Sequence, residues 1–192
     1  MIGVIGPLVR GKRELRGSVR PVALFALAAV AGAVTTGTLI GLLGGAGARV
    51  PAIAVGVAGC LLLLADLRFG TPSLRRQTCS TWYRDRGAGR AWAMWGFDLG
   101  LGFSTIRLSS LYWLMVLFVA AFVSPGLAPL VLAFYGLGLG VAFGAAVLAQ
   151  SRSAPSVTSP GLGLVHAAAP VRRASIALLG VASIAILVWG AW

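Results

Sequence analysis

Charged residues lie so far apart along this chain that they divide it into long apolar segments. A single charge, Arg49, lies between Arg20 and Asp66, and there is none between Arg107 and Arg152. A helix needs about 20 apolar residues to cross the roughly 30 Å hydrocarbon core of a bilayer. The pattern therefore predicts an all-α, polytopic membrane helical bundle that forms one integral-membrane domain over residues 1–192.

The predicted spans are bounded by basic residues and by turn-forming residues. Pro21 opens the first span, at a helix start where its missing N–H costs little. Gly and Pro clusters then separate one span from the next. We expect spans at Val22–Ala48, Val50–Ala65, Ser110–Val123, Leu127–Ala149 and from Ala174 to Trp192, with loops at Asp66–Arg90 and Gln150–Pro170.

The segment Ala91–Arg107 is apolar but is interrupted by Asp98 and by glycines, so it suits a full crossing, a re-entrant half-helix or an interfacial helix. Basic residues gather on the cytoplasmic side of membrane proteins. Five spans place fifteen basic residues on one side and Arg49 on the other, whereas six spans divide them eleven against five. Charge therefore favours five spans plus a re-entrant or short broken helix, with the amino terminus in the cytoplasm.

Composition argues against a soluble nucleic-acid-binding protein, which the net charge alone would suggest. The chain has a net charge of +12, but 58% of its residues are hydrophobic and only 10% are charged. A soluble domain has about 25% charged residues. We therefore expect a multi-pass protein of the bacterial cytoplasmic (inner) membrane. Its expected partners are the lipid bilayer with its anionic headgroups and a membrane-protein partner or a second copy, and not nucleic acid.

Two parts of the chain suggest an internal two-hairpin repeat. The segments Arg20–Asp66 and Arg107–Arg152 each contain two spans around a Gly- or Pro-containing turn, and each follows a short glycine-bearing apolar piece. Repeats with broken helices are how many transporters build a site at the middle of the membrane. The pattern resembles the small transmembrane domain of CcdA/DsbD-type thiol–electron carriers, and the resemblance implies that electrons pass across the membrane between thiol partners.

The cysteines depart from the pattern of that family, which carries one cysteine beside prolines in each repeat. Here Cys60 lies in the second span and Cys79 in the basic loop. Cys60 suits a buried small hydrophobic residue, whereas the arginines around Cys79 favour its thiolate. The two cysteines are therefore weak redox candidates, and no catalytic residue is transferred from the family.

Asp98 is the main candidate for a functional residue. A carboxylate at membrane depth is costly and marks a functional site by default. If Ala91–Arg107 is a continuous helix, then Asp98, Gly102, Thr105 and Ser109 share one face, which predicts a path for a substrate or ion. Arg107 falls roughly opposite. The alternative is a structural pair between Asp98 and an arginine, or a carboxylate near the lipid headgroups.

Small residues recur every four positions in two of the predicted spans. Such stripes let helix backbones approach closely in a membrane. We expect helix packing at Gly37, Gly41 and Gly45 in the first span and at Gly136, Gly140 and Gly144 in the span Leu127–Ala149.

The remaining chemistry-bearing residues predict neither a metal site nor a cofactor. His166 is the single histidine, and one histidine with four acidic residues makes no credible metal site. No nucleophile–base pair, phosphate loop or dinucleotide motif is present, so no enzyme activity is predicted. We expect a small transporter or transport-associated protein of unknown substrate. The alternative is a non-transporting component, either a thiol-redox relay or an accessory subunit of a larger membrane complex.

Overall fold

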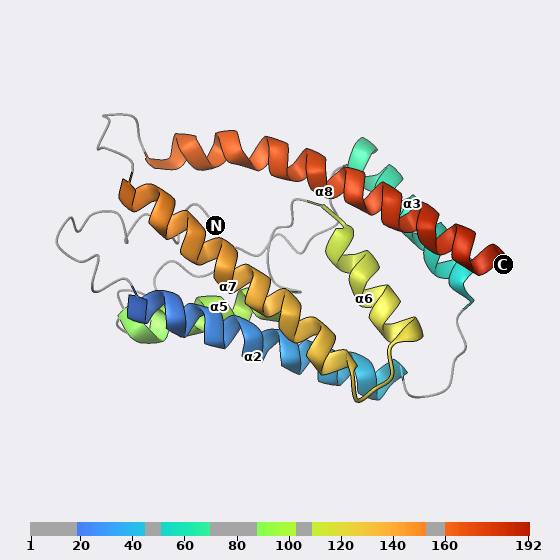
Figure 1. The fold of residues 1–192 in the computed structure, drawn as a ribbon, viewed down its shortest axis with the longest axis horizontal. Coiled ribbons are helices and arrows are strands. Elements are labelled where there is room, and N and C mark those ends of the chain that lie inside the picture. Colours follow the sequence, from blue (N-terminus) through green and yellow to red (C-terminus); the bar gives the residue numbers. More distant parts are fainter. Residues whose placement is uncertain (1–18, 45–50, 70–87, 103–108, 153–159) are drawn as a thin grey trace.

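The computed structural model describes residues 19–44, 51–69, 88–102, 109–152 and 160–192. Within these ranges the chain is all-helical and contains no strand, which confirms the predicted class of secondary structure. The helices, shown in Figure 1, are α2 (Val19–Gly44), α3 (Ala52–Arg68), α5 (Ala88–Leu101), α6 (Leu111–Phe122), α7 (Ala128–Arg152) and α8 (Pro160–Ala191).

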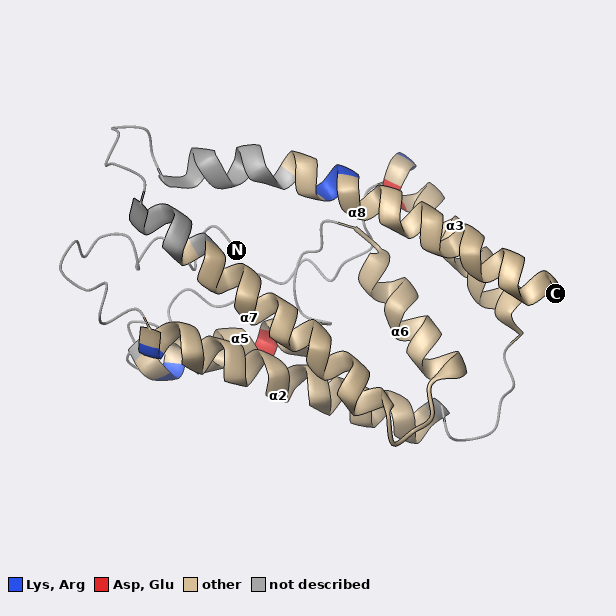
Figure 2. Ribbon diagram, in the orientation of Figure 1, with Lys and Arg blue, Asp and Glu red and all other residues tan. Residues whose placement is uncertain are grey.

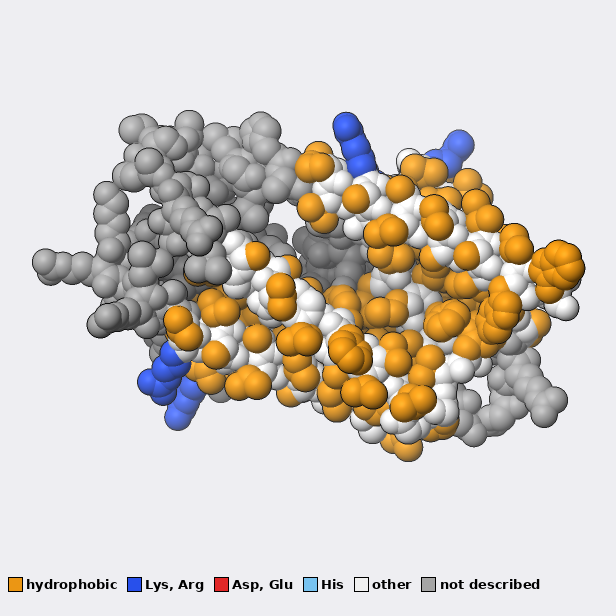
Figure 3. Space-filling view, in the orientation of Figure 1, with side chains coloured by type: hydrophobic (Ala, Val, Ile, Leu, Met, Phe, Trp, Pro, Cys, Tyr) orange, Lys and Arg blue, Asp and Glu red, His pale blue; other side chains and the backbone are white. Residues whose placement is uncertain are grey.

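Three of these helices are long and apolar enough to cross a membrane. The qualifying segments are Val19–Leu43 of α2, Ala128–Ala145 of α7 and Ala169–Ala191 of α8. Large apolar side chains such as Leu27, Leu64 and Phe134 cover the outer surface of the helices (Figure 3). An apolar exterior of this kind is compatible with a membrane protein, because lipid tails replace water around it.

Helix α2 packs between α5 and α7, and the backbones meet at small residues. The carbonyl oxygens of Phe25 and Ala29 lie against Gly96 and Gly100 respectively, so α2 and α5 run parallel. Ala29 also lies against Gly136, and Ala26 lies against Gly140, so α2 and α7 run antiparallel. Any larger side chain at these glycines would overlap the neighbouring backbone. The close approach of the three helices therefore depends on residues without bulky side chains.

Aromatic side chains fill the space between α2, α5 and α7. The rings of Phe25 and Phe143 stack with centroids 4.2 Å apart, and Trp92 lies 5.5 Å from Phe143. Trp92 and Trp95 meet edge to face at 4.9 Å, and both are buried. Trp92 and Trp95 are therefore core residues of the described structure, although their sequence position next to Arg90 is also typical of interface anchors.

A second group of helices is formed by α3, α6 and α8. Helices α3 and α8 run antiparallel, because Gly56 lies against Leu187 and Gly59 lies against Ser183. Helix α6 also contacts Gly59, through Leu114. A cluster of Val119, Ile40 and Leu132 then connects α6 to α2 and α7. The two groups are therefore joined through α6.

Most arginines of the described helices lie near helix ends: Arg20 and Arg90 at the starts of α2 and α5, and Arg68 at the end of α3. α2, α5, α6 and α8 run in one direction, and α3 and α7 run in the other. Because of these directions, the starts of α2 and α5 and the ends of α3 and α7 lie toward the same side of the bundle. Figure 2 shows blue basic positions at the starts of α2 and α5, at the end of α3 and within α8, whereas red acidic positions lie inside the tan helices. These basic residues are Arg20, Arg68, Arg90, Arg172 and Arg173.

Several predicted boundaries and pairings are wrong. Helix α3 continues to Arg68, so Asp66 lies in a helix and not in a loop. Helix α8 begins at Pro160 and continues through Pro170, so His166 is also helical, although Ser, Pro and Gly around it are typical of a loop. Proline suits the first turn of a helix, and a proline inside a helix is tolerated where the chain accepts a kink.

The two-hairpin repeat is not confirmed by the packing. Helices α2 and α3, which the repeat would place side by side, do not contact each other in the described part of the chain. α2 instead packs on α5 and α7, and α3 packs on α8. Glycine-mediated contacts between distant segments therefore outweigh the pairing of neighbours along the chain.

Candidate functional site

Helix α5 ends inside the bundle at Leu101. Gly102 has a φ of 80°, a left-handed conformation that ends a helix and that glycine adopts without steric cost. The carbonyl oxygen of Leu101 accepts hydrogen bonds from the hydroxyl of Thr36, at 2.8 Å, and from the hydroxyl of Tyr112, at 3.0 Å. These bonds satisfy a terminal carbonyl that has no partner within α5, as a helix end inside a bundle requires.

The end of α5 lies opposite the middle of α2. The α5 backbone from Phe97 to Leu101 lies against Gly32 of α2, and Thr36 contacts Leu101 one turn further on. α5 has 14 residues. It is therefore about 21 Å long at 1.5 Å per residue, shorter than the roughly 30 Å hydrocarbon core. The partial negative charge of its carboxyl end thus lies within the bundle.

Asp98 lies in the last turn of this short helix and is buried, with 8% of its surface exposed. This burial agrees with the high cost of exposing a carboxylate to hydrocarbon. A carboxylate near the carboxyl end of a helix is disfavoured by the helix dipole. Gly96 and Gly100, on either side of Asp98, lie against the α2 backbone. Asp98 therefore occupies a position that the helix dipole of α5 does not favour.

The expected polar face of Asp98 does not continue along one helix. The left-handed Gly102 ends α5, so Ser109 cannot share a helical face with Asp98. Ser109 is buried and lies at the start of α6. Thr105 and Arg107 lie outside the described residues. The prediction failed because it assumed an unbroken helix through a glycine that adopts a conformation few other residues can adopt.

Asp66 is a second buried carboxylate, which the sequence prediction placed in a loop. It is 0% exposed. Its Oδ2 atom accepts a hydrogen bond from the backbone N–H of Ser110 at 2.6 Å, and its Oδ1 atom accepts one from the Ser110 hydroxyl at 2.7 Å. Ser110 precedes α6 and makes no side-chain cap to that helix. Asp66 of α3 therefore caps the start of α6 from a different helix, where the helix dipole favours a negative charge.

The backbone of Asp66 connects this contact between α3 and α6 to α8. The guanidinium group of Arg172 donates a hydrogen bond to the Asp66 carbonyl oxygen at 2.9 Å. A basic side chain at the carboxyl end of a helix satisfies a terminal carbonyl and complements the dipole. Asp66, Ser110 and Arg172 thus tie α3, α6 and α8 together. Asp66 could have been recognised in the sequence, because it ends an apolar run and carries the same cost of burial as Asp98.

The predicted packing glycines lie at contacts between helices wherever the structure describes them. Gly37 lies against Pro129, and Gly41 lies against Pro125. Gly136 and Gly140 lie against α2, as described above, and a Cβ on Gly144 would lie 3.4 Å from Val22 Cγ1. Gly45 lies outside the described residues. The contacts of Gly32, Gly96 and Gly100 between α2 and α5 were not predicted, because their partners are far apart in the sequence.

The redox and metal candidates are not brought together by the described structure. Cys60 lies in α3 with a free, half-buried thiol. Cys79 lies outside the described residues. Within the described ranges, no group of three or more His, Cys, Asp or Glu side chains has an arrangement suited to a metal ion.

No protein family, no curated protein and no solved structure with which the chain was compared matches it. The resemblance to thiol–electron carriers therefore stays a hypothesis. The broken helix α5 and its buried carboxylate are the features on which a function is best based.

Proposed function

We propose that this protein is a small multi-pass membrane transporter, or a transport-associated protein, that handles a proton or a small cation at Asp98. The observation that carries the proposal is the end of α5 inside the bundle, one turn after a buried carboxylate. Transporters commonly bind coupling ions at the ends of discontinuous helices, where free carbonyls and the helix dipole supply negative charge.

The electrostatics at the end of α5 support binding of a positive species. The carboxylate of Asp98 and the partial negative charge of the helix end lie within one turn of each other. In a buried setting such charges interact more strongly than in water. A proton or a small cation at Asp98 would interact favourably with both groups. Hydroxyl groups of Thr36 and Tyr112 already bind the Leu101 carbonyl and so hold the helix end in place.

The directions of the helices support five crossings. α5 and α6 both run in the direction of α2, so together they make one passage across the bundle. α2, α3, α7 and α8 supply the other four. Arg20 and Arg90 at the starts of α2 and α5, and Arg68 at the end of α3, support a cytoplasmic location for that side of the bundle and for the amino terminus, by the positive-inside rule. We extend the proposal to the bacterial cytoplasmic membrane on the same basis.

Flux measurements on reconstituted protein test the role of Asp98. Proteoliposomes containing a trapped pH dye are given a potassium diffusion potential with valinomycin, and proton entry is recorded. Parallel vesicles measure the uptake of radioactive sodium. Wild-type protein should move one of these ions. Asp98→Asn should reduce that flux by about tenfold or more, equivalent to about 1.4 kcal/mol in the barrier. Asp98→Glu, which keeps the carboxylate, should retain measurable flux.

The stability of the same variants separates a functional from a structural role. Asp98→Asn protein should elute as a single species in detergent and should unfold at the wild-type temperature. Wild-type flux in the Asp98→Asn variant, or flux no greater than that of empty vesicles for both ions in the wild type, would refute the proposal. A loss of flux that follows a matching loss of stability would instead indicate a structural pair at Asp98.

One observation favours the alternative of an accessory subunit. Helix α8 is the most apolar of the three long segments, yet only 11% of its membrane-length window is buried within this chain. Its outer face is therefore free to pack against another membrane helix, as accessory subunits do. A thiol-redox relay would use Cys60, and Cys60→Ser should then abolish reduction of an added disulfide by the membrane protein. An unaffected Cys60→Ser variant would remove the redox alternative.

A further inference from the structure

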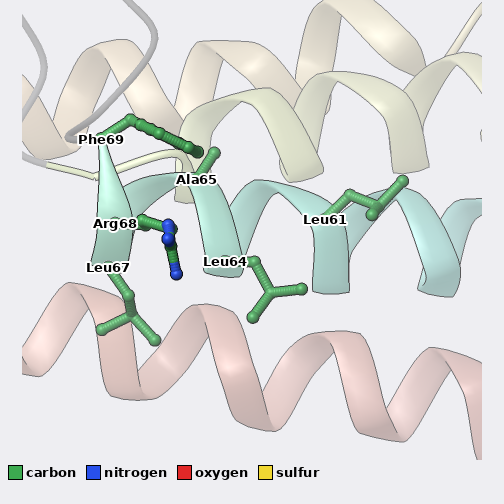
Figure 4. A pocket seen from close by; sticks show the side chains of 6 residues that line it. All are labelled: Leu61, Leu64, Ala65, Leu67, Arg68 and Phe69. Atoms are coloured by element: carbon green, nitrogen blue, oxygen red, sulfur yellow. The ribbon is translucent and has the colours of Figure 1, made fainter.

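The carboxyl end of α3 forms an open, apolar groove on the outer surface (Figure 4). Its volume is about 690 Å³, within the range of small-ligand sites. Leu61 and Leu64 are each 61% exposed, so the groove is presented to the surroundings of the bundle. The groove is lined by Leu61, Leu64, Ala65, Leu67, Arg68 and Phe69. Arg68 is its single charged residue.

Three exposed arginines gather at this end of the α3–α8 pair. Arg68 lies at the end of the groove, with its guanidinium carbon 6.0 Å from the ring centroid of Phe69. The hydrogen bond from Arg172 to the Asp66 carbonyl holds the basic pair Arg172–Arg173 of α8 beside the end of α3. Basic side chains project from the surface around α8 in Figure 3. The groove, which α3 and Phe69 line, therefore ends at Arg68, and α8 supplies two further arginines beside the end of α3.

The carboxylate nearest to these arginines does not neutralise them. Asp66 is fully buried, and both of its side-chain oxygens accept hydrogen bonds from Ser110. The other acidic side chain in the described ranges, Asp98, lies in α5, in the other group of helices. Among the described residues, no side-chain carboxylate forms an ion pair with Arg68, Arg172 or Arg173. Arginine guanidinium groups bind phosphate through two parallel hydrogen bonds, which gives such a cluster a preference for phosphate oxygens.

We propose that this surface is a binding site for an anionic phospholipid. The phosphodiester lies among Arg68, Arg172 and Arg173, and an acyl chain lies in the groove along Leu61 and Leu64. Basic pockets between membrane helices on the cytoplasmic side are where anionic headgroups bind. An apolar groove that runs directly into such a pocket fits a molecule with a charged head and a hydrocarbon tail. The proposal needs the chain to lie in a membrane, but it does not need Asp98 to carry an ion.

Photolabelling by lipids tests this site in the full-length protein. Proteoliposomes contain phosphatidylglycerol with a photoreactive acyl chain or, in parallel, phosphatidylcholine with the same chain. Labelled peptides are identified by mass spectrometry. Phosphatidylglycerol should label residues 61–69 several-fold more than phosphatidylcholine does. The double variant Arg68→Gln/Arg173→Gln should reduce that labelling by roughly tenfold, because each juxtamembrane arginine contributes to anionic-lipid binding. Arg172 is retained because it also bonds to α3.

A matched variant removes the same number of charges elsewhere. Arg20→Gln/Arg90→Gln lies at the α2–α5 end and should leave labelling of residues 61–69 unchanged. All variants are first checked for a single elution peak and an unchanged unfolding temperature. A variant pair that fails this check is replaced by Arg68→Lys, which keeps the charge but loses the two-pronged phosphate contact and should weaken labelling several-fold.

Three results would overturn the proposal. Equal labelling of residues 61–69 by the two lipids would show ordinary lipid contact without headgroup recognition. Labelling that falls equally in both double variants would show a general effect of net charge. Absence of lipid from the groove, together with disulfide-linked dimers of a Leu64→Cys variant, would show that a second copy of the chain covers α3. Ion flux is measured separately, so a failure at Asp98 and a failure at this groove are distinguishable.

Discussion

Replacing Asp66 should destabilise the protein more than any exposed substitution on α3, because Asp66 holds the start of α6. The change Asp66→Ala removes both acceptors of Ser110 and leaves a buried N–H and a buried hydroxyl without these partners. Each of the two unsatisfied buried donors costs about 1–3 kcal/mol, so together they cost about 2–6 kcal/mol, and the favourable position of the carboxylate at a helix start adds about 0.3–1 kcal/mol.

Two effects reduce that sum. Burying a carboxylate has its own cost, which the alanine variant avoids. Side-chain hydrogen bonds between membrane helices also average only about 0.6 kcal/mol. We therefore expect Asp66→Ala to lower the free energy of unfolding by about 2–4 kcal/mol. Asp66→Asn keeps one acceptor oxygen and should cost about half as much.

Unfolding by sodium dodecyl sulfate from mixed micelles, followed by circular dichroism, measures these changes. The double-mutant cycle with Ser110→Ala isolates the hydroxyl contact, and its interaction energy should be about 0.5–1.5 kcal/mol. Leu64→Ala, on the exposed face of α3, is the matched control and should change stability by less than about 0.5 kcal/mol. A cost for Asp66→Ala that equals the Leu64→Ala value would show that Asp66 does not cap α6.

Two further predictions concern packing and orientation. Gly140→Leu should lower stability by about 1–3 kcal/mol, because a Cβ there would lie 2.6 Å from Ala26 Cβ, whereas Gly138→Leu meets open space and should be tolerated. Equal stability of the two leucine variants would contradict packing through the α7 stripe. In a background in which both native cysteines are serine, Arg90→Cys should react only with membrane-permeant thiol reagents in intact cells. Gly126→Cys, in the exposed turn between α6 and α7, should react with impermeant ones, and the reverse pattern would invert the topology.

The positions of the helices follow largely from local sequence. The charge-free segments and their Gly or Pro boundaries placed α2, α3, α6 and α7 to within a few residues, because span length depends on consecutive apolar residues and not on partners. The burial of Asp98 has a different local reason, since a carboxylate is too costly to face lipid. The predictions were wrong where a residue type occurs both within helices and at their ends. Pro170 predicted a loop but lies within α8, and Gly102 was counted as a helical residue but ends α5.

Which helices pack against each other was decided by tertiary structure alone. Helix α2 packs on α5 and α7 because glycines from three distant segments let their backbones approach. No local sequence pattern predicts which row of small residues packs against which other row. Asp66 and Ser110 are 44 positions apart, so the cap that connects α3 to α6 exists only after both helices have packed. The same holds for Leu101, whose carbonyl oxygen is satisfied by hydroxyls from α2 and α6. Sequence by itself determined which segments avoid water, because that property belongs to each segment. Packing decided where the two buried carboxylates and the broken helix lie, because those positions depend on contacts between segments far apart in the chain.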